Sequence, residues 1–287
     1  MVTKSTPATV QRIVDTIGEL PASPAVVGAV MNLTSDLNST ITDITRVLSA
    51  DQSLTAKVLR LSNSSFYGRA KEVGTLAEAI IILGFFTVRS LVVASSAHSM
   101  YCRCNGMDRC NAERLWQHSL STGIAARCLI GTSIPEAAEE AFIAGLLHDI
   151  GKLVLMQKTG EIYEEIIHKA ENTGEPFPAL EQQWLGFDHC DVARELLANW
   201  AFPANLSTGI VSHHNPAVVT ESPVVAAVQL GNELSRHLQV GFSVPPSDSL
   251  ERHPAVAALG LDPENIPVVL EAVREQYTAE AGLFEEV

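Results

Sequence analysis

Apolar residues recur along most of this chain at intervals of three and four, the spacing that gathers them on one face of an α-helix. In residues 50–68, for example, such a stripe is formed by Leu54, Val58 and Leu61. Runs in which apolar and polar residues alternate, as in half-buried β-strands, are absent apart from short ambiguous runs such as residues 241–244. The hydrophobic pattern therefore predicts an all-α fold.

Turn-forming residues divide the apolar segments into separate predicted helices. Residues 75–100 read as two apolar helical pieces that join near Gly84. Residues 136–157 read as one helix, and Pro135 suits its first turn because the proline ring fits the backbone angles found there. The run "GFFTVRSLVV" in the first of these segments is expected to be core rather than a contact surface.

Two shorter amphipathic helices are predicted in the second half of the chain. Residues 187–203 contain one, with Asp188 as a candidate cap and Pro203 beyond its end. Residues 222–238 contain the other, and Ser222 precedes a proline at its start. No internal repeat or long linker is evident along the chain.

The segment "CRCNGMDRCN", residues 102–111, is the best position for a seam between two helical halves. We expect an N-terminal helical half over residues 1–108 and a second half over residues 109–287. The three cysteines of this segment do not have the usual spacing of a zinc ribbon, so ordinary thiols are expected there.

Composition and charge narrow the class of protein. The 287 residues are 46% apolar and 18% charged, which favours a heavily buried globule over disorder. A net charge of −14 repels phosphate backbones, so we expect no nucleic acid and no membrane as partner, although a local basic pocket can still hold a small phosphate. The chain opens without a secretory signal, and its five cysteines are an odd number, so we expect a cytoplasmic protein with reduced thiols.

Three ionisable residues interrupt the most apolar segment. His148, Asp149 and Lys152 lie within residues 141–157, where nearly every other side chain is apolar. Because His148 and Lys152 are four residues apart, a continuous helix would place them on one face. Such groups are costly to bury unless a cation neutralises them, so this segment is a candidate ligand site for a metal ion.

Further histidines are spread along the chain at the expected helices or their ends. The candidate metal ligands are His118, His148, Asp149, His189, His213, His214 and Asn232. Packed helices can bring such distant groups to one point. Neutral imidazoles suit iron, zinc, nickel and manganese, and a carboxylate can bridge two ions, so we expect one or two divalent metal ions. The remaining histidines, His98, His168, His237 and His253, are expected to be ordinary structural residues.

Two sets of motifs resemble the HDOD family, a relative of the HD and HD-GYP metal-dependent phosphohydrolases. The first set is "LPASPAVVGAVMNL", "ITDITRVLSADQSLTAKVLRLSNSSFYG" and "VGTLAEAIIILGFFTVRSLVV". The second is the histidine series itself, with "WAFP" after its third member. Together they cover about residues 17–238. The resemblance implies one continuous HDOD module in which an N-terminal helical half packs on an HD-like half, followed by a helical extension.

The resemblance also implies roles for individual residues. The chain keeps the histidines and Asp149 of HD phosphohydrolases, and it keeps Lys152, which would contact a phosphate oxygen beside the metal. It departs at Asn232, where the enzymes have an aspartate ligand, so the site is one negative charge short. The Gly-Tyr-Pro loop of the cyclic-di-GMP phosphodiesterases is missing after "HHNP", which argues against hydrolysis of cyclic di-GMP.

Two functions from different classes follow from this resemblance. The preferred one is a bacterial signal-transduction module that keeps a metal site, has little or no hydrolytic activity and acts on a signalling protein as a monomer or weak dimer. The alternative is a metal-dependent phosphohydrolase of a nucleotide or other phosphoester, in which Asp149 and Lys152 are catalytic. In that enzyme the metal would acidify a bound water into a nucleophile, and His213 or His214 could instead shuttle a proton.

Overall fold

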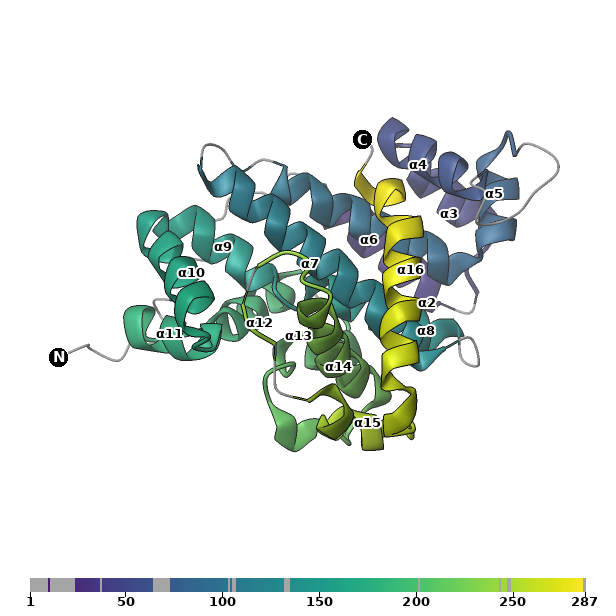
Figure 1. The fold of residues 1–287 in the computed structure, drawn as a ribbon. Coiled ribbons are helices and arrows are strands. Elements are labelled where there is room, and N and C mark those ends of the chain that lie inside the picture. Colours follow the sequence, from purple (N-terminus) through teal and green to yellow (C-terminus); the bar gives the residue numbers. More distant parts are fainter. Residues whose placement is uncertain are drawn as a thin grey trace. The chain divides into compact units, whose positions relative to one another are not determined.

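The computed structural model describes Val10 and residues 24–36, 38–63, 73–102, 104, 107–131, 135–200, 202–242, 244–246 and 249–285. Within these ranges the regular structure is entirely helical, which confirms the predicted all-α class (Figure 1). The motif residues Leu20 and Pro21 and the turn after Asn63 lie outside the described residues. The chain divides into two compact units, one built on Leu20–Met100 and the other on Tyr101–Ala281.

The described residues of the N-terminal unit form five helices. These are α2 (Pro24–Ser35), α3 (Ile41–Leu48), α4 (Gln52–Ser62), α5 (Leu76–Leu83) and α6 (Phe85–Tyr101). Side chains of Thr40, Asp51 and Thr75 cap α3, α4 and α5 by accepting hydrogen bonds from backbone N–H groups that the first helical turn leaves without a partner. Gly84 takes a positive φ of 78° between α5 and α6, which confirms the predicted join.

The predicted burial of the "GFFTVRSLVV" segment is confirmed for its second half, in α6. Val88, Leu91 and Val92 are at most 3% exposed, whereas Phe85 and Phe86 are half-buried. Among the described residues, no single helix is long and apolar enough to cross a membrane. The pair α5 and α6 reaches that length and composition only together, and it is bent by 108° at its break.

The C-terminal unit contains the other α-helices whose bounds the structure describes. They are α7 (Met107–Ile130), α8 (Pro135–Leu147), α9 (Ile150–Thr159), α10 (Glu161–Thr173), α11 (Phe177–Leu185), α12 (His189–Asn199), α13 (Ala204–Val211), α14 (Pro223–His237), α15 (Pro254–Ala258) and α16 (Ile266–Glu285). Asp188 caps α12 and Ser222 caps α14, as predicted, and Pro135 is the first residue of α8.

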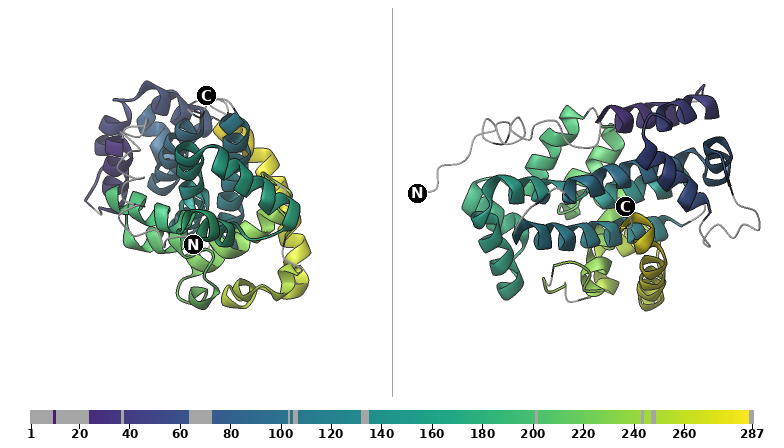
Figure 2. Two further views of the ribbon diagram at one scale, coloured as in Figure 1. Left: turned by 90° about the vertical axis from the view of Figure 1, so that its left-hand side faces the viewer. Right: turned by 90° about the horizontal axis from the view of Figure 1, so that it is seen from above.

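Helices α7, α8 and α14 pack closely against one another and form the centre of this unit (Figure 2). Three glycines make the close approach possible. A Cβ atom at Gly123 would lie 2.8 Å from the carbonyl oxygen of Phe142, and one at Gly145 would lie 2.8 Å from the Cα of Gly123. On α14, a Cβ at Gly231 would lie 3.0 Å from the carbonyl oxygen of Thr122. The unit therefore packs backbone against backbone around the helices that carry the candidate ligands.

The prediction of one continuous helix over residues 136–157 is wrong. The helix ends at Leu147, His148 and Asp149 form a turn, and α9 begins at Ile150. His148 and Lys152 therefore do not share the face of one helix. Successive side chains on a helix point about 100° apart. The break removes this constraint, and it lets the adjacent His148 and Asp149 direct their side chains into the same cluster.

Candidate metal centre

The structure brings the seven candidate ligands together from five separate places in the C-terminal unit. They are His118 on α7, His148 and Asp149 in the turn before α9, His189 at the start of α12, His213 and His214 after α13, and Asn232 on α14. Potential ligand atoms within 4.8 Å of one another form two groups. One contains Asp149, His189, His213 and His214, and the other contains His118, His148 and Asp149. Asp149 belongs to both groups and joins them.

One carboxylate oxygen of Asp149 faces the histidines that follow it in the sequence. Its Oδ1 lies 3.3 Å from Nε2 of His189 and 3.5 Å from Nε2 of His213. These two Nε2 atoms are 3.3 Å apart. His214 belongs to the same group and is the exposed member of it. Three imidazoles and one carboxylate oxygen therefore surround a single point.

The other oxygen of Asp149 faces a different set of groups. Its Oδ2 lies 3.3 Å from Nε2 of His148 and 3.7 Å from Nε2 of His118. The ammonium of Lys152 lies 2.7 Å from the same oxygen. Nε2 of His118 is also 3.0 Å from Oδ1 of Asn232. This side thus offers two imidazoles, one amide oxygen and the shared carboxylate, with a cation already in contact.

The spacing of these atoms is that of ligands around an ion. Nitrogen and oxygen ligands about 2.0–2.2 Å from a metal, at tetrahedral or octahedral angles, are roughly 3.0–3.5 Å from one another. Most of the separations around Asp149 fall in this range. A direct hydrogen bond between a nitrogen and an oxygen is usually shorter, about 2.9–3.0 Å. In addition, His148 and His213 have their proton on the other ring nitrogen and cannot donate to Asp149 from Nε2.

Hydrogen bonds from Nδ1 to the backbone fix the tautomers of two buried histidines. Nδ1 of His148 donates to the carbonyl oxygen of Gly145 at 2.6 Å, and Nδ1 of His213 donates to that of Ile210 at 2.7 Å. Because a carbonyl oxygen can only accept, both protons sit on Nδ1 and leave Nε2 as an electron pair directed at Asp149. Outer contacts of this kind are what hold metal-ligating histidines in place.

Glu181 holds His189 in the same manner and was not identified from the sequence. Its Oε2 accepts from Nδ1 of His189 at 2.6 Å and from the backbone N–H of His189 at 2.9 Å. Its Oε1 accepts from the hydroxyl of Tyr163 at 2.5 Å. Burial opposes the charge of His189, but the Glu181 carboxylate raises the pKa of His189 to about 10, so a metal ion that binds Nε2 would displace a proton. A carboxylate behind a histidine makes that imidazole a stronger ligand.

Two polar atoms at the centre of the cluster are buried without hydrogen bonds among the described residues. They are Nε2 of His148 and Oδ1 of Asp149. Leaving such atoms unsatisfied costs about 1–3 kcal/mol each, so a native protein normally supplies a partner. Burial also lowers the pKa of His118 to about 3, so its imidazole is neutral and able to bind a metal. The residues present therefore fit a metal ion in donor type and spacing.

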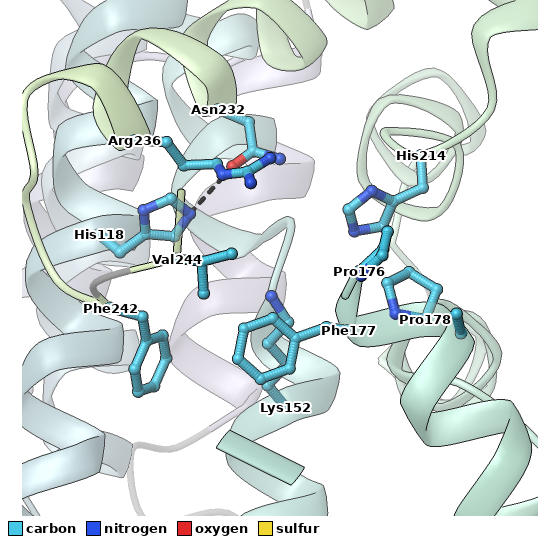
Figure 3. Close-up of a pocket in the computed structure, with 11 residues that line it drawn as sticks. His118, Lys152, Pro176, Phe177, Pro178, His214, Asn232, Arg236, Phe242 and Val244 are labelled. Atoms are coloured by element: carbon cyan, nitrogen blue, oxygen red, sulfur yellow. Dashed lines mark hydrogen bonds between the residues drawn. The ribbon is translucent and has the colours of Figure 1, made fainter. Parts of the chain in front are cut away.

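A cavity of about 420 Å³ opens beside the cluster (Figure 3). His118 and Asn232 lie on one side of it and His214 on the other, and the amine of Lys152 points into the space between them. Its lining also includes Arg236, Phe177, Phe242, Val244 and two prolines. The cavity thus combines an edge of the cluster, two cations and an apolar wall, which suits a small anionic ligand.

The histidines assigned to structural roles lie outside both groups. His168 contacts Asn172 on the surface of α10, Nδ1 of His237 bonds the backbone of its own helix, and His253 caps α15. His98 belongs to the N-terminal unit. The structure therefore separates the histidines into the two sets that the sequence order indicated.

Comparisons with known proteins agree on the family and the fold. Residues 20–216 match the HDOD domain family. An HDOD domain protein of unknown function from Geobacter sulfurreducens is 25% identical, with a TM-score of 0.81 over 98% of each chain. A candidate phosphohydrolase from Shewanella amazonensis SB2B is 23% identical, with a TM-score of 0.71 over 96% of this chain and 98% of its own. A candidate metal-dependent phosphohydrolase from the same organism is 16% identical, with a TM-score of 0.64 over 97% of each chain. No curated protein sequence is significantly similar to this chain.

Proposed function

Because the chain belongs to the HDOD domain family, we propose that it is a signal-transduction module that holds one or two divalent metal ions. Its centre binds a small phosphate-containing ligand and hydrolyses that ligand slowly or not at all. The imidazole-rich ligand set suits iron, zinc, nickel or manganese.

The observation that carries this proposal is the inward direction of three histidine Nε2 atoms, which converge on one carboxylate. His148 and His213 are held by backbone carbonyls, and His189 is held by a buried carboxylate. All three present Nε2 to Asp149. A cluster kept only for packing would also satisfy Nε2 of His148 and Oδ1 of Asp149, which have no hydrogen bond among the described residues, because unsatisfied buried nitrogens and oxygens destabilise the fold.

Each residue has a distinct part in holding the ligand. A bound metal ion would supply a Lewis acid for a phosphate oxygen. The Lys152 ammonium, which lies in the cavity lining, would contact a second phosphate oxygen and neutralise part of its charge. Phe177 and Phe242, whose ring centroids are 5.7 Å apart, form an apolar wall for the remainder of the ligand.

The neutral side chain of Asn232 supports a binding role over rapid turnover. An amide oxygen is a weaker ligand than a carboxylate and leaves the metal centre more positive. A more positive centre holds an anionic phosphate group more tightly, in the ground state as well as in the transition state. Binding that is uniform across both states does not speed the chemical step.

The specific observation that favours the alternative, a metal-dependent phosphohydrolase, is the cavity itself. It reaches His118, His214 and Asn232 directly, so a phosphoester placed there would meet the cluster. Lys152 and Asp149 would then act on the substrate. A broad phosphoester screen with added Mn²⁺ decides between the two functions. We expect slight activity at most, whereas robust turnover that Asp149→Ala abolishes would establish the enzyme.

The signalling role implies a protein partner in the cytoplasm. The net charge of −14 supports a partner other than nucleic acid or an anionic membrane, since both would be repelled. We propose that the module acts as a monomer or weak dimer. A gel-shift assay with DNA and RNA at low salt is expected to show no binding, and a shift there would contradict this part of the proposal.

Metal content tests the proposal most directly. We expect protein purified without chelators to contain a stoichiometric transition metal by elemental analysis, and Asp149→Ala to lose it. His168→Ala is a matched control because this exposed histidine lies outside the cluster. Absence of metal from the wild-type protein, even after reconstitution with each candidate ion under anaerobic conditions, would refute a metal centre.

A further inference from the structure

We propose that the two ion positions around Asp149 are unequal and that Lys152 controls the weaker one. A first ion binds beside Oδ1, and a second binds beside Oδ2 only when a phosphate group in the cavity draws the Lys152 ammonium away. This inference rests on the proposed function, and it adds a regulatory property to the same site. Phosphate and the second ion would then bind cooperatively.

The ion position beside Oδ1 has the features of a high-affinity metal site. Three histidines surround it, and Oδ1 has no hydrogen bond among the described residues. Glu181 stands behind His189 and brings a second negative charge to this side. An ion that enters here is bound by the groups already around Oδ1 and displaces no side chain.

The Oδ2 position is obstructed and poorer in charge. Lys152 holds Oδ2 at 2.7 Å, so an ion there must displace a salt bridge that is almost fully buried. The third group on this side is the neutral amide of Asn232, which already contacts Nε2 of His118 at 3.0 Å. Only His148 presents an Nε2 atom without a hydrogen bond to this side. The second ion must therefore displace a lysine side chain, whereas the first displaces none.

Charge balance points in the same direction. Histidines that bind a metal are neutral, so the protein groups that stay ionised in the loaded centre are Asp149, Glu181 and Lys152, which together carry one negative charge. One divalent ion turns this into one positive charge, and a second ion turns it into three. Accumulating like charge in a buried site is unfavourable, so the second ion needs an accompanying anion. A doubly charged phosphate group returns the total to one positive charge.

Lys152 is the group able to respond to that anion. Its ammonium lies between Oδ2 of Asp149 and the ring of Phe177, 4.3 Å from the ring centroid, and it lines the cavity (Figure 3). The other cation of the lining, Arg236, is committed to Glu233 at 2.6 Å and to the carbonyl oxygen of Pro245. A lysine on a flexible stem can exchange one anionic partner for another at little cost.

The test is a titration of metal-free protein with Mn²⁺ by equilibrium dialysis, with and without inorganic phosphate. Chloride at equal ionic strength is the control, and electron paramagnetic resonance distinguishes an isolated Mn²⁺ from a coupled pair. Without phosphate we expect one ion to bind tightly and a second to bind with an affinity lower by at least about tenfold. Changes in the contacts of metal ligands alter affinity on this scale. With phosphate we expect the second affinity to rise at least about tenfold and a coupled pair to form. Two equally tight ions without phosphate would overturn the inference, as would a second ion that does not respond to phosphate.

Two variants separate the effect of Lys152 on the second ion from the effect of Asn232. Asn232→Asp adds the missing negative charge, and it should give two tight ions without phosphate while Lys152 remains. Lys152→Met removes the ammonium but keeps a side chain of similar length, so the second ion should bind more tightly without phosphate and respond to phosphate less than in the wild-type protein. Lys169→Met, which alters a surface lysine paired with Glu175, should behave as wild type. If Asn232→Asp leaves one ion only, the charge argument is wrong.

The outcome also separates this inference from the proposed function. Failure to bind any Mn²⁺ would refute the metal centre itself. Two ions bound equally and independently of phosphate would leave the metal centre standing and remove only the role of Lys152. Folding of Lys152→Met is checked by circular dichroism, and the wild-type and Asn232→Asp titrations decide the question if that variant does not fold.

Discussion

Gly151 is the position where a single added methyl group should disturb the centre most. The residue lies in the first turn of α9, two residues after Asp149. A Cβ atom there would lie 2.0 Å from the carbonyl oxygen of His189, and Cβ contacts in proteins are essentially never under 3.0 Å. In Gly151→Ala, helices α9 and α12 must therefore separate by at least about 1 Å, because both contacting atoms are close to or part of rigid backbone.

That displacement is large compared with what a metal site tolerates. Distances from a metal to its ligands vary by only about 0.2 Å around their preferred values. The shift moves His189 on α12 away from Asp149 before α9, so we expect the variant to lose at least about tenfold in metal affinity. Overpacking of this kind also costs about 1–3 kcal/mol in the free energy of unfolding. For a domain of this size, that lowers Tm by roughly 2–12 °C.

Metal titration and thermal unfolding of metal-free protein measure the two effects separately. Gly282→Ala on α16 is the control because a Cβ there meets nothing within 4 Å, so it should be neutral or slightly stabilising. A Gly151→Ala protein with the metal affinity and Tm of this control would show that α9 and α12 are not in the close contact on which the site depends.

Three further outcomes are expected from the same geometry. Glu181→Gln should weaken metal binding about 10–100-fold by loosening His189, whereas Glu165→Gln on the surface of α10 should not; equal affinities would contradict the buttressing role. Arg127→Ala should cost about 3–5 kcal/mol in chemical unfolding, because it strands the buried Glu280 carboxylate, whereas the exposed Arg274→Ala should change stability by less than about 0.5 kcal/mol. Chelation of a metal present at 100 times its Kd should lower stability by about 2.7 kcal/mol, and an unchanged Tm would show that the folded state holds no ion.

The sequence by itself determined the helical class and many helix boundaries. Apolar residues at helical spacing predict buried faces, and capping residues such as Asp188 and Ser222 mark helix starts through contacts within a few residues. The candidate ligands were also identifiable in advance, since histidines and one aspartate in that order carry a family pattern. Their role as ligands remains a prediction, and the structure adds that their side chains meet.

Only the tertiary structure decided how those side chains meet. The break at His148 and Asp149 falls inside an apolar segment whose local pattern favours a continuous helix, so contacts with other helices must select it. Glu181 is an unremarkable charged residue in its own helix, and its role exists only because α11 brings it behind His189. The two unequal faces of Asp149 arise in the same way, from five separate places in the unit. Periodicity along a chain records which residues are buried, but packing alone sets which distant groups are buried together.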